Sequence, residues 1–332
     1  MLVIDEERIF EEIKRRKAKR VVMNAPDGLL NKVHNLSKKL ERELGIEVII
    51  VAEPSYGSCD TVDEEALKLN ADVAFHIGHK ISLPFLGKRT VFIDAYDDVS
   101  FKDVLEKALP LIKDFKRIGL CTISQHIHSL KEAKEFLEKM GKEVVIGKGK
   151  GQLLDGQIFG CEFYPVYSIK DEVDIFLFLG QSRFHAIGVA LSTNKPTLML
   201  DPYLKEVEDI SPLVDERYKR AILSIYKALD AKNFGIIIGL KEGQLSLLRA
   251  LQLKEKIKKF GRDVSLIALR EVKDDRLLLF KDIEVFIQTA CPRISLDDYH
   301  EKLVLSVPQA EALIALWEGK KIDDFLLKSH WL

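Results

Sequence analysis

The chain has 332 residues, of which 47% are hydrophobic and 31% are charged, a composition typical of a soluble globular protein with two or three domains. The 51 Lys and Arg residues balance the 52 Asp and Glu residues, which excludes a global basic field that would attract nucleic acid or anionic membranes. Acidic residues stand near the start of the chain where a signal peptide would be cationic, and no apolar run approaches the ~20 residues needed to span a bilayer. We therefore expect a cytoplasmic protein with neither a membrane partner nor a direct nucleic-acid partner.

One pattern occurs three times along the chain. A near-continuous apolar run is followed by apolar residues spaced three and four apart, then by a glycine and a second apolar run. Each copy predicts a strand, a helix and a second strand, which form a right-handed βαβ unit with parallel strands. The copies cover residues 19–54, 116–147 and 233–269.

Two further apolar runs follow each copy and predict a third and a fourth strand. The third strands are ADVAFHIGH, VDIFLFLGQ and IEVFIQTAC, and the fourth are TVFIDAY, PTLMLDPY and LVLSVP. The sequence thus predicts an α/β protein of three homologous parallel-sheet domains, at residues 1–110, 111–215 and 216–332, with a linker around residues 210–212. Ligands bind outside the carboxyl ends of parallel strands. We therefore expect the three sheets to surround one central site with pseudo-threefold symmetry.

Three of the four cysteines fall near strand ends, one in each predicted domain. Cys59 follows the second strand of the first copy in EPSYGSCD, and Cys161 follows the second strand of the second copy in DGQIFGCE. Cys291 closes the third strand of the third copy in IQTACPR. Cys121 lies within a strand among apolar neighbours, where a free cysteine behaves as a small hydrophobe. We predict that Cys121 belongs to the core and that the other three thiols reach the central site.

Several interpretations of these three thiols stay open at this point. Four cysteines are too few for a disulfide framework, which favours metal binding or catalysis. Structural zinc usually takes paired cysteines and a fourth ligand, so it requires a residue such as His79 to complete the site. A 4Fe–4S cluster held by three thiolates leaves one iron open to a substrate. For any one cysteine alone, an unpaired loop thiol is the plainest interpretation.

Five stretches of the chain together resemble a known family of enzymes. YGSCD, HIGH, GQSRFHAIG, KPTLMLDPY and QTACPRISLDD are similar, in this order, to motifs of the diphthamide synthase family, the 2-(3-amino-3-carboxypropyl)histidine synthases. The resemblance reaches to about residue 310 and implies three α/β domains, each giving one cysteine to a 4Fe–4S cluster. Here the ligands are expected to be Cys59, Cys161 and Cys291, which through the cluster are also the catalytic residues.

The resemblance also implies the reaction and its participants. The family transfers the 3-amino-3-carboxypropyl group of S-adenosylmethionine to a histidine of translation elongation factor 2, the first step of diphthamide biosynthesis. The transfer is a radical reaction that leaves methylthioadenosine. We accordingly expect S-adenosylmethionine as co-substrate, elongation factor 2 as protein substrate, an electron donor and a homodimer.

A strand-to-helix turn in the second domain is the candidate site for S-adenosylmethionine. Backbone N–H groups at a helix start favour an anion, and Arg183 suits a bidentate contact with the carboxylate of the co-substrate. The alternative for Arg183 is a surface arginine in a turn. The candidate residues in this turn are Gly180, Gln181, Ser182, Arg183 and His185.

Three more residues complete the candidate set for the co-substrate. Asp201 and Tyr203, at the end of the fourth strand of the second domain, are expected to contact the ammonium group or the ribose. Asp201 is equally suited to cap the segment that follows it. Arg293, two residues after Cys291, is a candidate for balancing cluster charge or holding substrate, and its alternative is a plain ion pair.

Two rival functions are consistent with the same cysteine pattern. Quinolinate synthase also arranges three α/β domains around a 4Fe–4S cluster held by three cysteines, and it uses the open iron as a Lewis acid. A ligand-binding or scaffold protein with incidental thiols is the non-enzymatic rival. Of these three functions, only the transfer of the aminocarboxypropyl group predicts methylthioadenosine as a product.

Overall fold

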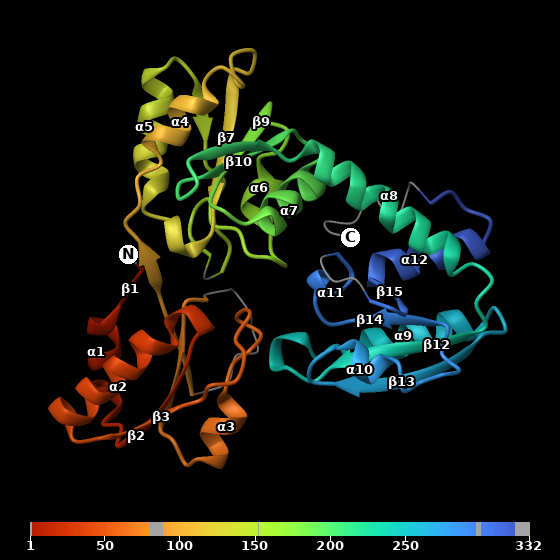
Figure 1. The fold of residues 1–332 in the computed structure, drawn as a ribbon, viewed down its shortest axis with the longest axis horizontal. Helices are drawn as coiled ribbons and strands as arrows, with labels where there is room; N and C mark the ends of the chain where they lie inside the picture. Colours follow the sequence, from red (N-terminus) through yellow and green to blue (C-terminus); the bar gives the residue numbers. More distant parts are fainter. Residues whose placement is uncertain (1, 80–88, 152, 297–299, 323–332) are drawn as a thin grey trace.

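The computed structural model describes residues 2–79, 89–151, 153–296 and 300–322, and Figure 1 shows three lobes built around three separate sheets. Residues 323–332 lie outside the described part. Within the described ranges, none of the helices combines the length and the apolar character that crossing a bilayer requires.

The first sheet has four parallel strands in the order β3-β2-β4-β5. Its strands are β2 (Arg20–Asn24), β3 (Glu47–Ile50), β4 (Val73–Ile77) and β5 (Thr90–Ile93). Its helices are α1 (Glu6–Arg16), the 3-10 turn η1 (Asp27–Leu29), α2 (Leu30–Leu44) and α3 (Asp63–Lys68). A separate antiparallel pair, β1 (Leu2–Ile4) with β6 (Ala95–Asp97), joins the chain start to the segment that leads into the second lobe.

The second sheet has five strands in the order β11-β10-β9-β7-β8, of which only the edge strand β11 is antiparallel. Its strands are β7 (Arg117–Thr122), β8 (Glu143–Val145), β9 (Ile175–Leu179), β10 (Thr197–Asp201) and β11 (Glu206–Asp209). Its helices are α4 (Lys102–Ala108), η2 (Ser124–His126), α5 (Ser129–Lys139), α6 (Tyr164–Ser168) and α7 (Arg183–Thr193). The strand β11 was not predicted.

The third sheet has four parallel strands in the order β13-β12-β14-β15. Its strands are β12 (Asn233–Gly239), β13 (Asp263–Leu269), β14 (Val285–Gln288) and β15 (Leu303–Leu305). Its helices are η3 (Glu242–Gln244), α9 (Leu247–Lys258), α10 (Asp274–Leu277), α11 (Pro292–Leu296) and α12 (Val307–Trp317). All three sheets therefore share one order of their four parallel strands, in which the first strand lies between the second and the third.

The segment predicted as a linker is instead the start of a long helix. Ile210 is fully buried, and α8 (Ser211–Lys227) begins at the next residue with Pro212 in its first turn, where a missing N–H group costs nothing. In Figure 1, α8 runs from the second lobe to the third, and it packs against α7 at one end and α12 at the other. The connection between these lobes is thus a packed helix.

A carboxylate just before the third strand binds the start of the first strand in each sheet. Asp72, Asp174 and Glu284 precede the third strand of their copies. Each accepts hydrogen bonds of 2.7 to 3.0 Å from the backbone at the start of the first strand of its own sheet. These hydrogen bonds lower the pKa of Asp72 and Glu284, while Arg117 and the backbone lower the pKa of Asp174 to about 2. The same carboxylate–backbone contact in all three sheets supports the triplication that the sequence pattern predicts.

Paired positions on the first and third strands show how each core fills its volume. The pairs are Val22–Ala74, Gly119–Phe176 and Gly235–Phe286. In the second and third sheets, a Cβ on the glycine would lie only 2.4 Å or 2.9 Å from the phenylalanine ring. In the first sheet the larger residue of the pair stands on the first strand, and in the other two sheets it stands on the third strand. Each pair therefore combines a larger with a smaller residue, which conserves core volume.

Candidate metal centre

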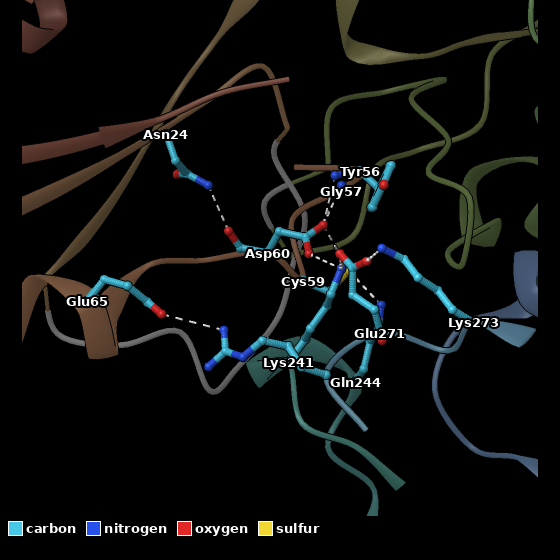
Figure 2. A network of polar contacts seen from close by, with 11 residues as sticks. Asn24, Tyr56, Gly57, Cys59, Asp60, Glu65, Lys241, Gln244, Glu271 and Lys273 are labelled. Atoms are coloured by element: carbon cyan, nitrogen blue, oxygen red, sulfur yellow. Dashed lines mark hydrogen bonds and ion pairs between the residues drawn. The ribbon is translucent and has the colours of Figure 1, made fainter. Parts of the chain in front are cut away.

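Cys59 lies in the loop that follows β3, and its neighbour Asp60 holds this loop in place (Figure 2). One carboxylate oxygen of Asp60 accepts backbone N–H hydrogen bonds from Tyr56 at 2.8 Å and Gly57 at 3.0 Å. The backbone carbonyl of Asp60 accepts a hydrogen bond from the side chain of Asn24, at the end of β2, at 2.8 Å. The cysteine is thus fixed at the carboxyl end of the first sheet.

The third lobe reaches this loop through the turn after β12. The Lys241 ammonium lies 2.5 Å from an Asp60 carboxylate oxygen, and only 10% and 6% of the two side chains are exposed. The Gln244 amide nitrogen lies 3.2 Å from the Cys59 sulfur (Figure 2). A buried ion pair and a side-chain hydrogen bond therefore join the first and third lobes beside the first thiol.

Cys161 occupies the tip of a tight turn between Phe159 and Glu162. The backbones of these two residues exchange hydrogen bonds of 2.9 and 3.0 Å. Gly160 packs so closely on Phe184 that a Cβ would lie 2.4 Å from that ring. The Phe159 ring faces the first lobe, where a Cβ on Gly57 would lie 3.4 Å from it. The turn that carries Cys161 therefore packs against the loop that carries Cys59.

Cys291 stands between β14 and α11, as its position at a strand end predicts. Its carbonyl accepts a hydrogen bond from the Ile294 backbone at 3.1 Å, which starts the helical turn. The Arg293 guanidinium lies over the Phe184 ring of α7, at 5.0 Å from the ring centroid. The third thiol is thus held where the third lobe meets the second.

Burial and nearby charges raise the pKa of all three thiols. Burial raises the pKa of Cys59 to about 12, with further increases from the charges of Asp60 and Cys291. Surrounding protein raises the pKa of Cys161, and the charges of Cys291 and Cys59 add to this effect. Burial also raises the pKa of Cys291, against the opposing charge of Arg293. These charge effects agree with the packing of the Cys161 turn against the Cys59 loop and of Arg293 against Phe184.

The structure confirms the core assignment of Cys121. This side chain is fully buried in β7, and its sulfur lies 3.8 Å from the Leu177 carbonyl. Cys161, in contrast, is exposed at the tip of its turn.

The donor set fits an iron–sulfur cluster better than a single zinc ion. Among the residues that the structure describes, no three His, Cys, Asp or Glu side chains approach closely enough to hold one metal ion. His79, the candidate fourth zinc ligand, stands 6.3 Å from Phe159 between ring centroids. Each thiolate of a 4Fe–4S cluster binds its own iron, so three facing sulfurs that do not meet at one point suit it. Soft thiolate ligands also favour such clusters.

The turn predicted to bind S-adenosylmethionine contains residues with different surroundings. Gly180 has φ 148°, and Ser182 precedes α7 with its hydroxyl 2.7 Å from the His185 ring. The Arg183 side chain is 65% exposed and pairs with Glu208 of the edge strand β11 at 2.8 Å. Arg183 therefore has the surface contact that the sequence analysis gave as its alternative.

The His185 ring meets the Phe184 ring edge-on, at 5.2 Å between centroids. Burial lowers its pKa to about 3, and the charges of Arg293 and His79 contribute to the decrease. Its ring stacks on Phe178 at 6.2 Å between centroids. Of the residues predicted for the co-substrate, His185 and Arg293 thus both contact Phe184.

The other predicted residues form a second polar group at the carboxyl ends of β7, β9 and β10. The Gln181 carbonyl oxygen lies 3.3 Å from a ring nitrogen of His126, whose ring centroid is 6.0 Å from that of Tyr203. The Tyr203 hydroxyl donates to Asp97 at 2.6 Å, and burial with this hydrogen bond raises the phenol pKa. Asp201 accepts the backbone N–H group of Tyr203 at 2.8 Å, which is the capping role considered for it.

The sequence patterns did not indicate Lys241, Gln244 or Asp60 as site residues. The available signal was positional, because LKEGQ follows the first strand of the third copy at the carboxyl end of the sheet. Nothing in the sequence pairs this turn with the Cys59 loop, since the contact spans more than 180 positions.

Known proteins resemble this chain over nearly its whole length. The model of the diphthamide synthesis protein family matches residues 25–323. A 2-(3-amino-3-carboxypropyl)histidine synthase of Pyrococcus horikoshii is 39% identical over 328 residues, which cover 97% of this chain and 94% of that protein. Subunit 1 of the Schizosaccharomyces pombe synthase is 31% identical over 86% of this chain and 67% of its own length. The crystal structure of Dph2 from Pyrococcus horikoshii with a 4Fe–4S cluster superposes with a TM-score of 0.88 at 37% identity, covering 98% and 95% of the two chains.

Proposed function

Since the chain belongs to the diphthamide synthesis protein family, we propose that Cys59, Cys161 and Cys291 hold a 4Fe–4S cluster at the centre of the three lobes. The activity is the transfer of a 3-amino-3-carboxypropyl group to a histidine, the first step of diphthamide biosynthesis. The observation that supports the proposal is the mutual packing of the three segments that carry these cysteines. Phe159 lies against Gly57 of the Cys59 loop, and Phe184 contacts both Gly160 and Arg293. Incidental thiols have no reason to meet in this way.

The residues around the thiols have defined tasks in this reaction. The chemistry that the bound cluster supplies is one electron for cleavage of a carbon–sulfur bond in S-adenosylmethionine, the co-substrate. Phe159 and Phe184 pack beside the thiols and limit access of water to the reacting atoms. Arg293 places a positive charge next to Cys291, where it offsets the charge of the bound thiolates.

The two polar groups of the second lobe provide contacts for the rest of the co-substrate. We assign Gly180, Ser182 and His185 to its amino-acid end, and the group of Gln181, Asp201 and Tyr203 to its nucleoside end. Arg183 binds the carboxylate of the co-substrate after it leaves its ion pair with Glu208. An exposed ion pair contributes only about 0–1 kcal/mol, so this exchange costs little.

The acceptor proposed for the aminocarboxypropyl group is a histidine of elongation factor 2. The anaerobically reconstituted protein, supplied with dithionite, S-adenosylmethionine and the factor, is expected to release methylthioadenosine and to add the mass of the group to the factor. Chromatography and mass spectrometry measure the two products. A variant of the factor without the acceptor histidine is the control.

Each rival function predicts a different result in this assay. Methylthioadenosine without a mass gain on the factor would refute the acceptor and leave the cleavage reaction intact. A reconstituted cluster without methylthioadenosine would favour the Lewis-acid chemistry of a quinolinate synthase. Failure of the wild-type protein to bind iron and sulfide would favour the scaffold interpretation.

We also propose that the protein works as a homodimer in the cytoplasm and draws its electron from a separate donor. A surface of exposed leucines on the third lobe is the proposed dimer contact, and we call it the leucine surface. No charged residue lies between Gln244 and Leu248, and an apolar patch can contact its own copy across a twofold axis. Its members are Leu240, Leu245, Leu247, Leu248 and Leu251, each between 41% and 70% exposed.

Leu248→Asp is expected to convert the dimer to a monomer, because dimer formation would then bury an unpaired charge. Light scattering coupled to size-exclusion chromatography measures the mass. Leu204→Asp is the matched control, since Leu204 is 69% exposed on the second lobe and lies outside the leucine surface. An unchanged dimer in the Leu248 variant would rule out this surface as the contact.

A further inference from the structure

The amide group of Gln244 faces the sulfur of Cys59 across the boundary between the third and the first lobe. The amide nitrogen lies 3.2 Å from the sulfur, within hydrogen-bonding range (Figure 2). A thiolate only accepts hydrogen bonds, so the NH₂ end of the amide is the end that binds it. Through this contact, a side chain of one lobe acts on a sulfur that another lobe supplies.

The backbone holds Gln244 in this position. Its own N–H group donates to the Lys241 carbonyl at 2.9 Å and closes the η3 turn. The turn lies so close to the end of β12 that a Cβ on Gly239 would stand 2.9 Å from the Gln244 Cβ and 3.1 Å from its carbonyl oxygen. Gly239 therefore permits an approach that a larger residue would block.

Contacts on both sides of Gln244 fix its distance from Cys59. Lys241 pairs with Asp60, next to the cysteine, and its ammonium lies 5.0 Å from the centroid of the Tyr56 ring. The carboxylate of Glu242 accepts a hydrogen bond of 2.5 Å from the Thr61 hydroxyl. Residues before and after Cys59 are thus bound to residues of the same turn that presents Gln244, so the N–H···S contact is preorganised.

We propose that Gln244 is a positioning residue that donates a hydrogen bond to the Cys59 thiolate and thereby raises the reduction potential of a cluster bound there. This inference rests on the proposed function. Reduction adds negative charge to a cluster and its sulfur ligands, and a donor aimed at one of those sulfurs stabilises the more negative state. Gln244 therefore makes the electron uptake that begins the reaction easier.

Gln244 is also the donor that a side-chain substitution can remove. Cys291 receives its hydrogen bond from the backbone of Arg293, which most substitutions leave in place. The contribution of one ligand sulfur can thus be changed while the second keeps its donor. Gln244→Leu removes the amide, and Gln244→Glu keeps the length of the side chain and replaces the donor with a carboxylate.

The test is a redox titration of the reconstituted proteins, followed by electron paramagnetic resonance of the reduced cluster. We expect reduction of the Gln244→Leu cluster to be about tenfold less favourable than in the wild type, which is ~59 mV for a one-electron couple. Gln244→Glu is expected to shift the potential further in the same direction, because it adds a negative charge. Gln252→Leu on α9 removes an exposed glutamine that does not face a thiol and is expected to leave the potential unchanged.

Iron and sulfide content and the melting temperature are measured on the same samples. Full cluster content with a wild-type potential in both Gln244 variants would overturn the proposal. Loss of the cluster from both variants would also overturn it, because Gln244 would then be needed for assembly and not for the potential. Failure of the wild-type protein to assemble a cluster would refute the proposed function itself, so the two failures are distinguishable.

Discussion

Alanine at Cys59, Cys161 or Cys291 is expected to abolish cluster absorbance and methylthioadenosine formation, whereas alanine at Cys121 preserves both. Each of these three cysteines is one of the three proposed protein ligands, and its loss leaves one iron without a protein ligand. Loss of residues that merely orient metal ligands typically costs 10- to 100-fold, so loss of a ligand should lower activity by at least about 100-fold. Iron and sulfide content, visible absorbance and product formation measure the effect.

Cys121→Ala is the matched control because it removes the same atom from a different environment. Cys121 is buried among apolar side chains of β7, so its replacement costs stability through a small cavity, about 1 kcal/mol. Cluster content should stay at the wild-type level. A cluster that survives in the alanine variant of Cys59, Cys161 or Cys291, or that disappears in the Cys121 variant, would contradict the proposed ligand set.

Much of the fold is predictable because it depends on local patterns. The switch from continuous to helical apolar spacing occurs in each copy, and Gly45, Gly141 and Gly261 end the helices with positive φ, as glycine permits. The sequence does not predict β11 because its residues, EVED, are mostly charged. They are also partly exposed, as edge-strand residues can be. The sequence at the start of α8 suits a linker as well as a helix, because a proline, which ends many helices, also fits the first turn of a new one.

The candidate site was predictable only in part. The place of each cysteine after a strand, Cys59 after β3, Cys161 after β8 and Cys291 after β14, follows from each copy by itself. Their convergence depends on how the copies dock, and docking is set by contacts such as Lys241 with Asp60 that have no local pattern. The same limit explains why Asp201 and Arg183 each had two interpretations before their partners were known.

Lys241→Met is expected to destabilise the protein by about 3–5 kcal/mol, because the Asp60 carboxylate is left buried without its cation. Both side chains are at most 10% exposed, so water does not replace the lost partner. The same substitution is expected to lower cluster content, since Asp60 holds the loop of Cys59. Denaturant unfolding and iron content measure the two effects.

Lys273→Met is the matched control on a neighbouring element. The Lys273 side chain is 64% exposed and pairs with Glu271 at 2.7 Å, and exposed ion pairs contribute only about 0–1 kcal/mol. It should therefore leave stability and cluster content nearly unchanged. Equal effects of the two methionine substitutions would show that the buried pair does not join the lobes.

Combining Lys241→Met with Asp60→Asn separates the ion pair from the loop that it anchors. Asparagine keeps an oxygen for the N–H groups of Tyr56 and Gly57 but carries no charge, so the double variant buries no unpaired ion. Its loss of stability is expected to be smaller than the sum of the two single losses by about 1–3 kcal/mol, the coupling typical of residues in contact. Cluster content should recover in parallel, because the Cys59 loop then keeps its backbone hydrogen bonds. Strict additivity would mean that Lys241 stabilises the junction through its contact with the Tyr56 ring and not through Asp60.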